Sequence, residues 1–272
     1  KYKLSKLKTI CSTGSPLSKE GFEYIYENIK KDVHISSISG GTDIVSCFVL
    51  GNLYQPVNMG EIQNKGLALN VDIFNDKGKP VKNSKGELVC KNPFPSMPLK
   101  FWNDKKDSKF KEAYFNRFVN TWHHGDFAET KKTGGFIIHG RSDTTLNPGG
   151  VRIGTAEIYS EVEKFNEIKE SIVVGQSWDN DVRIILFIVI NKKFFLTENL
   201  LKKIKMQIRK NASPRHVPSK VIVVKDIPRT KSGKIVELAV KNTIEGNNIK
   251  NKEALANPEV LEQFKNLKEL RY

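Results

Sequence analysis

Cysteine and histidine are scarce in this sequence, with three and five residues among 272. Neither type shows the close, repeated spacing of a metal site, and three dispersed cysteines cannot form a disulfide framework. We interpret the cysteines as small buried apolar side chains and the histidines as structural residues. This usage fits a reducing compartment, the cytosol. The residues concerned are Cys11, Cys47, Cys90, His34, His123, His124, His139 and His216.

Long hydrophobic runs are also missing. No apolar stretch approaches the ~20 residues that a membrane-spanning helix needs, and the chain opens without a signal-peptide pattern. Hydrophobic residues make up 38% and charged residues 28% of the sequence, which is ordinary for a globular protein. The first residue is Lys1 rather than Met. We interpret the chain as a fragment that starts within a domain.

Arginine is rare although the chain is strongly basic. The formal net charge is +15, yet only eight of the 45 basic residues are arginine, and the lysines are spread along the chain. Arginine is the commoner reader of base edges, and no zinc-finger or RNA-binding motif is present. Small anionic ligands explain the charge as well, so nucleic acid is not the expected partner. A basic binding fragment remains as an alternative.

Apolar residues in the first half alternate between strand-like and helix-like spacing. Lys8–Cys11 and Val33–Ser36 have the composition of buried strands, and Glu20–Lys30 between them carries apolar residues on one helical face. Further along, short strands separated by turns predict a small β-barrel or sheet. These strands are expected at Ala68–Phe74, Trp122–Glu129 and Phe136–His139.

The second half has a different pattern. Thr155–Phe165 and Leu200–Arg209 carry apolar residues at helical spacing. Three apolar, β-branched segments predict strands at Ser171–Gly175, Arg183–Ile190 and Val221–Val224. The change of pattern near Asp143 predicts a boundary between a domain over residues 1–142 and a second over residues 143–272. The expected fold class is mixed, α/β and α+β.

Five loops rich in glycine and hydroxyl groups carry the residue types of a phosphate or nucleotide site. They are, in order, Ser12–Leu17, Ser37–Asp43, Trp122–Asp126, Gly140–Glu157 and Pro228–Lys234. In the last loop, Gly233 would let the Lys234 ammonium approach a negatively charged oxygen closely. This loop is not a P-loop, because the glycine spacing and the final Ser or Thr are missing. Each loop alone is more often a simple turn, so the order and spacing of all five carry the argument.

In this order, and over nearly the whole chain, the five loops resemble those of the adenylate-forming enzymes, in the acyl-CoA synthetase branch. Ser37–Asp43, Asn147–Glu157 and the C-terminal residues Asn251–Tyr272 resemble the acetoacetate-activating members of that branch. The resemblance implies a ligase that uses ATP and Mg²⁺ to convert acetoacetate to acetoacetyl-AMP. It then transfers the acyl group to coenzyme A, with AMP and pyrophosphate as the other products.

The same resemblance implies a fold and its missing parts. Residues 1–142 would be the C-terminal part of a large AMP-binding domain, an α/β piece plus a small β-barrel. Residues 143–272 would be a small, mobile α+β domain. The family's phosphate loop, rich in Ser, Thr and Gly, is absent, as is most of the acyl pocket. We therefore expect the chain to need the N-terminal half of the same enzyme and to be inactive alone. Another short-chain acyl-CoA synthetase, for example for propionate, is the alternative.

Residue roles follow from the resemblance. The nucleotide would lie against Gly14, Ser15, Pro16, Ser37, Thr42, Asp126, Arg141 and Arg152. Within this set, Thr42 would hold the α-phosphate and Asp126 would accept hydrogen bonds from the ribose hydroxyls. Asp43, where the family usually has Glu, would help to hold Mg²⁺. Lys234 would support adenylation, which makes Lys234, Thr42 and Asp43 the expected catalytic set.

The second half-reaction has its own expected residues. Gly149 and Gly150 would border the pantetheine arm of coenzyme A, and Arg209 would lie near its nucleotide. Asp143 would be the hinge between the two domains, because it lies at the change of pattern and Asp tolerates unusual backbone angles.

Besides Asp43, two further positions differ from other members of the family. Acetate-activating relatives carry Trp at the position of Gly40, so Gly40 would leave room for a larger acid in the substrate pocket. After Lys234 the family often continues with basic residues, whereas Glu237 stands here.

Overall fold

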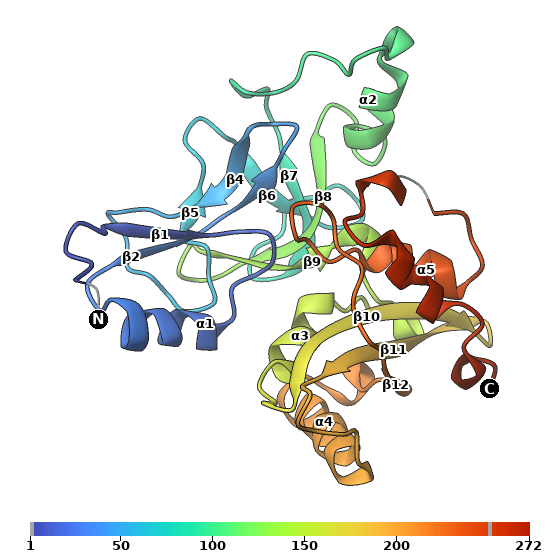
Figure 1. Cartoon of the computed structure of the whole chain (residues 1–272). Helices are drawn as coiled ribbons and strands as arrows, with labels where there is room; N and C mark the ends of the chain where they lie inside the picture. The colour runs from blue at the N-terminus through green and yellow to red at the C-terminus, as the bar shows by residue number, and fades with distance from the viewer. Residues whose placement is uncertain (1–2, 250–251) are drawn as a thin grey trace. The chain divides into compact units, whose positions relative to one another are not determined.

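The computed structural model describes residues 3–249 and 252–272 (Figure 1). It divides into two compact units, unit 1 over Lys1–Ser142 and unit 2 over Asp143–Tyr272. Each unit has hydrophobic cores of its own. Across the described ranges, no helix is long and apolar enough to cross a membrane.

Unit 1 opens with a β-α-β element. Its parts are β1 (Thr9–Ser12), α1 (Lys19–Tyr24), the π-helical turn η1 (Ile25–Ile29) and β2 (His34–Ser37). β1 and β2 pair in parallel, and the Ser18 side chain caps α1 by accepting a hydrogen bond from the Gly21 amide at 3.2 Å. The core of the element consists of Phe22, Ile25, Val33 and Ile35. Both predicted strands and the predicted helix are confirmed.

The rest of unit 1 consists of two antiparallel sheets. The first has the order β3-β4-β5 and the second the order β6-β7-β8-β9. Their strands are β3 (Ser39–Gly41), β4 (Ser46–Leu50), β5 (Asn64–Lys65), β6 (Val71–Phe74), β7 (Lys85–Cys90), β8 (Trp122–Thr130) and β9 (Phe136–Arg141). The strands predicted in this region are confirmed, although β6 begins later than expected.

The predicted β-barrel is wrong. Closure of a barrel requires a continuous ladder between the outermost strands. Here β5 has only two residues, and an isolated bridge between Ile62 and Phe136 connects its neighbourhood to β9. In the part of the chain that the structure describes, the two sheets therefore stay open.

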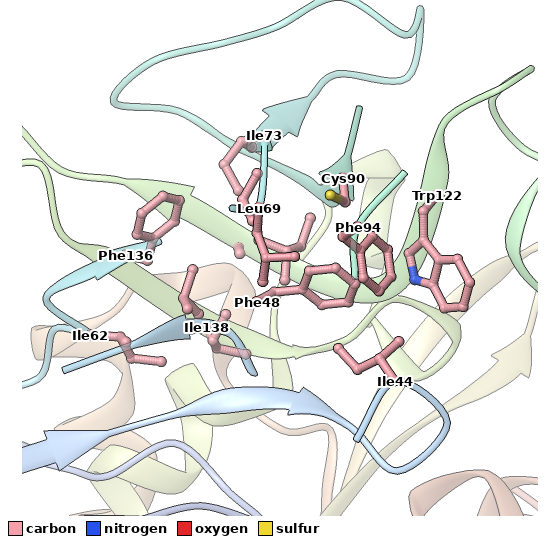
Figure 2. Close-up of a cluster of buried hydrophobic side chains, with 14 of the residues drawn as sticks. Ile44, Phe48, Ile62, Leu69, Ile73, Cys90, Phe94, Trp122, Phe136 and Ile138 are labelled. Carbon is pink, nitrogen blue, oxygen red and sulfur yellow. The ribbon is translucent and has the colours of Figure 1, made fainter. Parts of the chain in front are cut away.

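Figure 2 shows the core of these two sheets. Phe94 meets Phe48 edge to face with ring centroids 5.4 Å apart, and it meets Trp122 in the same way at 5.5 Å. The charge distribution of aromatic rings favours this arrangement. Between β7 and β8 the chain forms η2 (Lys105–Asp107) and α2 (Ser108–Tyr114), and α2 packs on β8.

The three cysteines are free but differ in exposure. Cys90 is buried, Cys47 is half-buried and Cys11 is exposed. The prediction of buried cysteines is therefore wrong for Cys11, because β1 alternates exposed and half-buried positions and Cys11 takes an exposed one.

Unit 2 is built on a three-stranded sheet of order β10-β11-β12, in which β10 and β11 are antiparallel and β11 and β12 are parallel. Its main elements are α3 (Thr155–Val162), β10 (Ile168–Trp178), β11 (Asp181–Ile190), α4 (Glu198–Asn211), β12 (Lys220–Val223) and α5 (Glu237–Ile244). The short 3-10 turns are η3 (Ser142–Thr144) at the boundary, η4 (Pro148–Gly150), η5 (Pro214–His216), η6 (Lys252–Ala254), η7 (Pro258–Phe264) and η8 (Lys268–Leu270). The predicted helices and strands of this unit are confirmed.

Alternate residues of β10 and β11 contribute to two separate cores, one on each face of the sheet. Val173 and Leu186 pack with α3 and α4, whereas Val174 and Phe187 pack with α5 and η7. The apolar stripe of α4 is fully included in the first core and consists of Leu200, Ile204 and Ile208. Each fully buried side chain of this size stabilises the fold by about 1.5–3 kcal/mol.

Candidate functional site

In unit 1, the carboxyl ends of β1 and β2 lie side by side. The Ile38 amide donates a hydrogen bond to the Ser12 carbonyl at 2.9 Å. A loop that contains Gly14 (φ +95°) follows β1, and Ser37, which is buried, ends β2. Of the predicted residues, Gly14, Ser15 and Pro16 in this loop are exposed, as are Thr42 and Asp43 in the turn between β3 and β4. The carboxyl ends of parallel strands are where α/β sheets bind ligands, so the loop after β1 and Ser37 lie at a suitable edge.

A buried carboxylate, Asp126 on β8, is the centre of this site. Arg141 on β9 donates from Nη1 to Asp126 Oδ1 and to the His124 carbonyl, both at 3.0 Å. Ser39 donates to Asp126 Oδ2 at 3.1 Å. Gly125 (φ +82°) allows this geometry, because a Cβ atom there would lie 2.6 Å from Arg141 Nη2. Each carboxylate oxygen still has a lone pair for a further donor, so Asp126 can accept two hydrogen bonds from a diol.

His124 belongs to the same cluster, although the sequence analysis assigned it a structural role only. Its side chain is only 9% exposed and its ring centroid lies 4.7 Å from that of Phe48. A Cβ atom on Gly41 would lie 2.7 Å from its Cε1 atom. Nε2 is 3.9 Å from Asp126 Oδ2. Burial lowers the pKa of His124, more strongly than the Asp126 carboxylate raises it, so the ring is neutral at pH 7. Its position two residues before Asp126 on a strand, hence on the same face, was the available signal.

Gly40 has a backbone role in this structure. A Cβ atom there would lie 2.1 Å from the Ser46 carbonyl oxygen and 2.6 Å from Cys47 Cα, both on the neighbouring strand β4. The close approach of β3 and β4 therefore requires glycine. A side chain at Gly40 would point into the β4 backbone. That Gly40 leaves room for a larger acid in the substrate pocket stays a prediction.

Asp43 is held by a residue that the sequence analysis missed. The Tyr114 hydroxyl donates to Asp43 Oδ2, and the Tyr114 ring stacks on Trp122 with centroids 3.7 Å apart and an interplanar angle of 15°. Burial, followed by the Asp43 carboxylate, raises the pKa of Tyr114 well above its ordinary value, so the hydroxyl keeps its proton. Tyr114 and Asp43 are 71 residues apart in sequence, so no local sequence pattern predicts their contact.

The chemistry of Asp43 fits the predicted magnesium ion. Mg²⁺ in phosphate-transferring sites is typically bound by one or two carboxylates, the substrate phosphates and water. Asp43 supplies one exposed carboxylate. Within residues 3–249 and 252–272, no group of three or more His, Cys, Asp or Glu could hold a metal ion by itself. Asp43 would therefore share such an ion with the phosphates of a nucleotide.

In unit 2, Lys234 is exposed at the end of a tight hairpin loop. Arg229 and Ile235 form its antiparallel bridge, and Gly233 (φ +86°) makes the turn. The Thr230 amide donates to the Lys234 carbonyl at 2.8 Å, and the Lys234 amide donates to Thr230 Oγ1 at 3.1 Å. These bonds fix the backbone of Lys234 while its ammonium group stays in solvent.

A second hairpin presents Gly149 and Gly150, and a bridge between Leu146 and Ile153 closes it. Both glycines have positive φ, +57° and +75°, so other residues would be strained there. The Gly149 amide donates to both carboxylate oxygens of Asp181 at 2.9 Å. The amide hydrogen bonds to this carboxylate lower the pKa of Asp181. Asp181, which fixes the position of the glycines, was not predicted from the sequence.

The basic residues of unit 2 lie on different elements. Arg152 is half-buried at the foot of the glycine hairpin, and Arg209 is exposed in the last turn of α4. Arg215, which the sequence analysis did not single out, lies in η5 with Nη1 3.5 Å from the Gly149 carbonyl. Arg215 therefore supplies a cation directly beside the glycine hairpin.

Glu237 lies at the start of α5. Its contacts explain why an acidic residue stands where the family often has basic ones. It accepts hydrogen bonds from Thr155 Oγ1 at 3.3 Å and from the Tyr159 hydroxyl at 3.2 Å, both on α3. Burial, with a smaller contribution from the charge of Asp143, raises the pKa of Glu237. Glu237 thus connects α5 to α3 close to the predicted hinge residue.

Residues 157–234 match the family described as AMP-binding enzyme C-terminal domain. A Rhizobium meliloti protein named acetoacetyl-coenzyme A synthetase is 61% identical over 270 residues, which are 99% of this chain and 42% of that protein. The Gallus gallus acetoacetyl-CoA synthetase is 47% identical over 99% of this chain and 41% of its own length. This chain is homologous to the C-terminal part of the acetoacetyl-CoA synthetases.

Solved structures agree with that assignment. The acetoacetyl-CoA synthetase from Streptomyces lividans superposes with a TM-score of 0.88 at 39% identity, over 96% of this chain and 41% of that protein. A benzoate CoA ligase from Burkholderia xenovorans superposes with a TM-score of 0.73 at 22% identity, which shows the shared fold alone. The predicted family and the mixed fold class are confirmed. The chain spans about two fifths of the length of the curated acetoacetyl-CoA synthetases that it matches.

Proposed function

We propose that this chain is the C-terminal part of an ATP-dependent acetoacetate–CoA ligase of the cytosol. The observation that carries the proposal is the buried Asp126 carboxylate, oriented by Arg141 and Ser39 at the open ends of β1 and β2. The acid to be activated is taken from the names of the relatives, one of which is 61% identical to this chain over the matched segment of 270 residues.

In the first half-reaction, a carboxylate oxygen of acetoacetate attacks the α-phosphorus of ATP, and pyrophosphate leaves. Asp126 would hold the ribose through its two hydroxyls, and Thr42 would donate to the α-phosphate. The Lys234 ammonium would stabilise the negative charge that develops on the phosphate oxygens. Mg²⁺, when bound by Asp43 and the phosphates, would neutralise further charge. Pro16 and the rest of the loop after β1 would lie against adenine.

In the second half-reaction, the thiol sulfur of coenzyme A attacks the acyl carbon, and AMP leaves. Gly149 and Gly150 would border the pantetheine arm, because they leave no side chain in its path. Arg209, with Arg215 beside the hairpin, would attract the phosphates of coenzyme A. The two half-reactions use different faces of unit 2, so Asp143 would act as the hinge that exchanges them.

A hybrid protein tests the proposal. In this hybrid, the chain replaces the corresponding C-terminal part of the Rhizobium meliloti relative. We expect acetoacetate-dependent exchange of pyrophosphate into ATP, with acetoacetate preferred over acetate, propionate and benzoate. Asp126→Asn should lower the affinity for ATP about tenfold or more by weakening the ribose contact. Preference for another acid would instead support a different short-chain acyl-CoA synthetase.

A third possibility, a basic binding fragment, is tested on this chain alone. Calorimetric titration with AMP, coenzyme A and a DNA duplex of equal phosphate concentration compares the ligands directly. We expect heat from AMP or coenzyme A that Asp126→Asn or Arg215→Ala reduces. Binding to the duplex alone, unaffected by either substitution, would contradict the proposal.

A further inference from the structure

The match to the AMP-binding enzyme C-terminal domain ends at Lys234, yet a later segment folds back onto the Lys234 loop. This clamp segment is Ala254–Asn257. Leu255 within it forms an antiparallel bridge with Thr230. The Lys231 amide donates to the Ala254 carbonyl at 3.2 Å, and the Ala256 amide donates to the Arg229 carbonyl at 2.8 Å. The clamp segment thus pairs with the loop through one antiparallel bridge and its two backbone hydrogen bonds.

The pairing is on the side of the loop that its own hairpin leaves open. Within the hairpin, Arg229 pairs with Ile235 and the Thr230 amide bonds to the Lys234 carbonyl. The strand that leads into the loop is therefore hydrogen-bonded on both edges. A two-stranded hairpin alone is marginally stable in water, and a third strand is what normally stabilises it.

The Asn257 side chain extends this ladder. Its Oδ1 accepts from the Arg229 amide at 2.9 Å, and its Nδ2 donates to the Ile227 carbonyl at 3.0 Å and to Asp226 Oδ2 at 3.2 Å. The next residue, Pro258, has no amide hydrogen to continue a backbone ladder. The Asn257 amide group therefore takes the place of a peptide group where the backbone pairing stops.

The clamp segment is itself fixed to the core of unit 2. Leu255 is buried, and in the following turn η7 Phe264 meets the Phe187 ring of β11 edge to face at 4.9 Å. Gln263 donates to the Asp226 carbonyl at 2.8 Å and accepts from the Lys225 amide at 2.7 Å. The loop is thus connected through the clamp segment to the central sheet.

We propose that the clamp segment positions Lys234 for adenylation, with Asn257 as its main positioning residue. The inference rests on the proposed role of Lys234. A lysine ammonium is a point charge on a flexible stem, so its placement depends on the backbone that carries it. A misplacement of about 1 Å at a charge-stabilising group costs on the order of a hundredfold in rate. Asn257 acts through the backbone of Arg229 and Ile227, to which its side chain is hydrogen-bonded.

Amide hydrogen exchange on this chain tests the clamp without any activity. Asn257→Ala should speed the exchange of the Arg229 and Ala256 amides about tenfold, since it removes the acceptor of the Arg229 amide and loosens the attachment of the clamp segment. Amides of β10 and β11 should keep their protection. Asn247→Ala, the same change at an exposed position of unit 2, is the matched control. If Asn257→Ala lowers protection in β10 and β11 as well, the isosteric Asn257→Asp is measured in its place.

The two half-reactions of the hybrid then connect the clamp to function. We expect Asn257→Ala to lower adenylate formation about tenfold and to leave thioester formation from supplied acetoacetyl-AMP unchanged. Lys234→Ala is the reference for the loop itself. Equal losses in both half-reactions, or faster exchange with normal adenylation, would overturn the proposal. Were Lys234→Ala without effect while exchange still responded to Asn257→Ala, the adenylation role of Lys234 would be at fault and the positioning role would fall with it.

Discussion

The sheet of β1 and β2 and the sheet of β10, β11 and β12 each contain a parallel strand pair connected through a helix, but they are covered to different extents. The first has two strands and a core of four buried residues, with Cys11 exposed on β1. The second has three strands with a large core on each face. Parallel sheets are normally buried on both faces, and an isolated strand pair is marginal in water.

Unit 1 also carries the most exposed apolar side chains of the described residues. In unit 1, Leu67, Leu99 and Trp102 are each more than nine-tenths exposed. Exposed apolar groups of this size commonly mark surfaces that another part of a protein covers. The relatives are more than twice as long as the matched segment. We infer that the cores of unit 2 cover its sheet on both faces, whereas the pair β1 and β2 is covered less.

The largest expected effect tests this comparison directly. In hydrogen exchange on this chain, the amides of β1 and β2 should exchange about a thousandfold faster than those of β10 and β11, because local opening of a two-stranded sheet costs far less free energy. In the hybrid protein, protection of β1 and β2 should rise towards that of β10 and β11. Equal protection of the two sheets in this chain alone would contradict the inference.

The next effect concerns Lys234, the lysine in the loop that the clamp segment holds. In the hybrid, Lys234→Ala should lower adenylate formation by about a hundredfold to a thousandfold, the usual loss for one charge-stabilising donor. Thioester formation from supplied acetoacetyl-AMP should be unchanged. Lys203→Ala, at an exposed position on α4, is the control. A similar loss for both lysines would mean that net charge, not position, matters.

A third prediction concerns the boundary between the units. Asp143→Pro fixes φ and removes an amide donor, so it should slow thioester formation by about tenfold or more and affect adenylate formation less. Asp143→Ala keeps the backbone freedom and should have a small effect on both. The two half-reactions of the hybrid are measured separately. A normal rate of thioester formation in the Asp143→Pro variant would contradict the assignment of Asp143 as the hinge.

A smaller effect is expected at Gly40. Gly40→Ala should destabilise unit 1 by about 3 kcal/mol, the upper end of overpacking costs, because the obstructing atoms belong to the β4 backbone. Gly134→Ala, at a turn with φ +88° and no atom within 4 Å of the new Cβ, should cost only about 1 kcal/mol. Denaturant unfolding of this chain measures both. If Gly40→Ala leaves the free energy of unfolding unchanged, the β4 backbone does not require glycine there, and the predicted role of Gly40 as a wall of the substrate pocket is favoured.

The smallest effect is pH-dependent and lies in unit 2. Burial, helped by Asp143, raises the folded-state pKa of Glu237, so the folded state binds this proton more readily than the unfolded chain does. The resulting stability is fully present below the unfolded pKa of about 4.3, and it is lost as the pH rises through the folded value. Glu237→Gln should therefore raise the Tm by a few degrees at pH 8 and hardly at all at pH 4. Glu259→Gln, at an exposed position, should change neither value.

Local patterns predicted most of the fold, since the strands of unit 2 and its helix α4 follow the apolar periodicity of their own residues. The barrel was predicted wrongly because closure depends on pairing between strands far apart in sequence, which periodicity does not contain. The same limit applies to the site. The loop with Lys234 was recognisable from its residues, whereas Tyr114 beside Asp43 and Asp181 beside Gly149 depend on contacts 71 and 32 residues away.

The edge-to-face contact of Phe264 with Phe187 has a consequence for biosynthesis. Phe187 lies in the middle of the sheet, but the residues that cover its face include Leu261, Phe264 and Leu270, which the ribosome adds much later. The face of the sheet that packs with α5 thus stays solvent-exposed on the nascent chain, available to chaperones, while the opposite face can already pack with α3 and α4. Unit 2 should therefore acquire its full cooperativity only after residues up to Leu270 have left the exit tunnel, so that ribosome-bound chains stalled before Leu261 remain sensitive to protease.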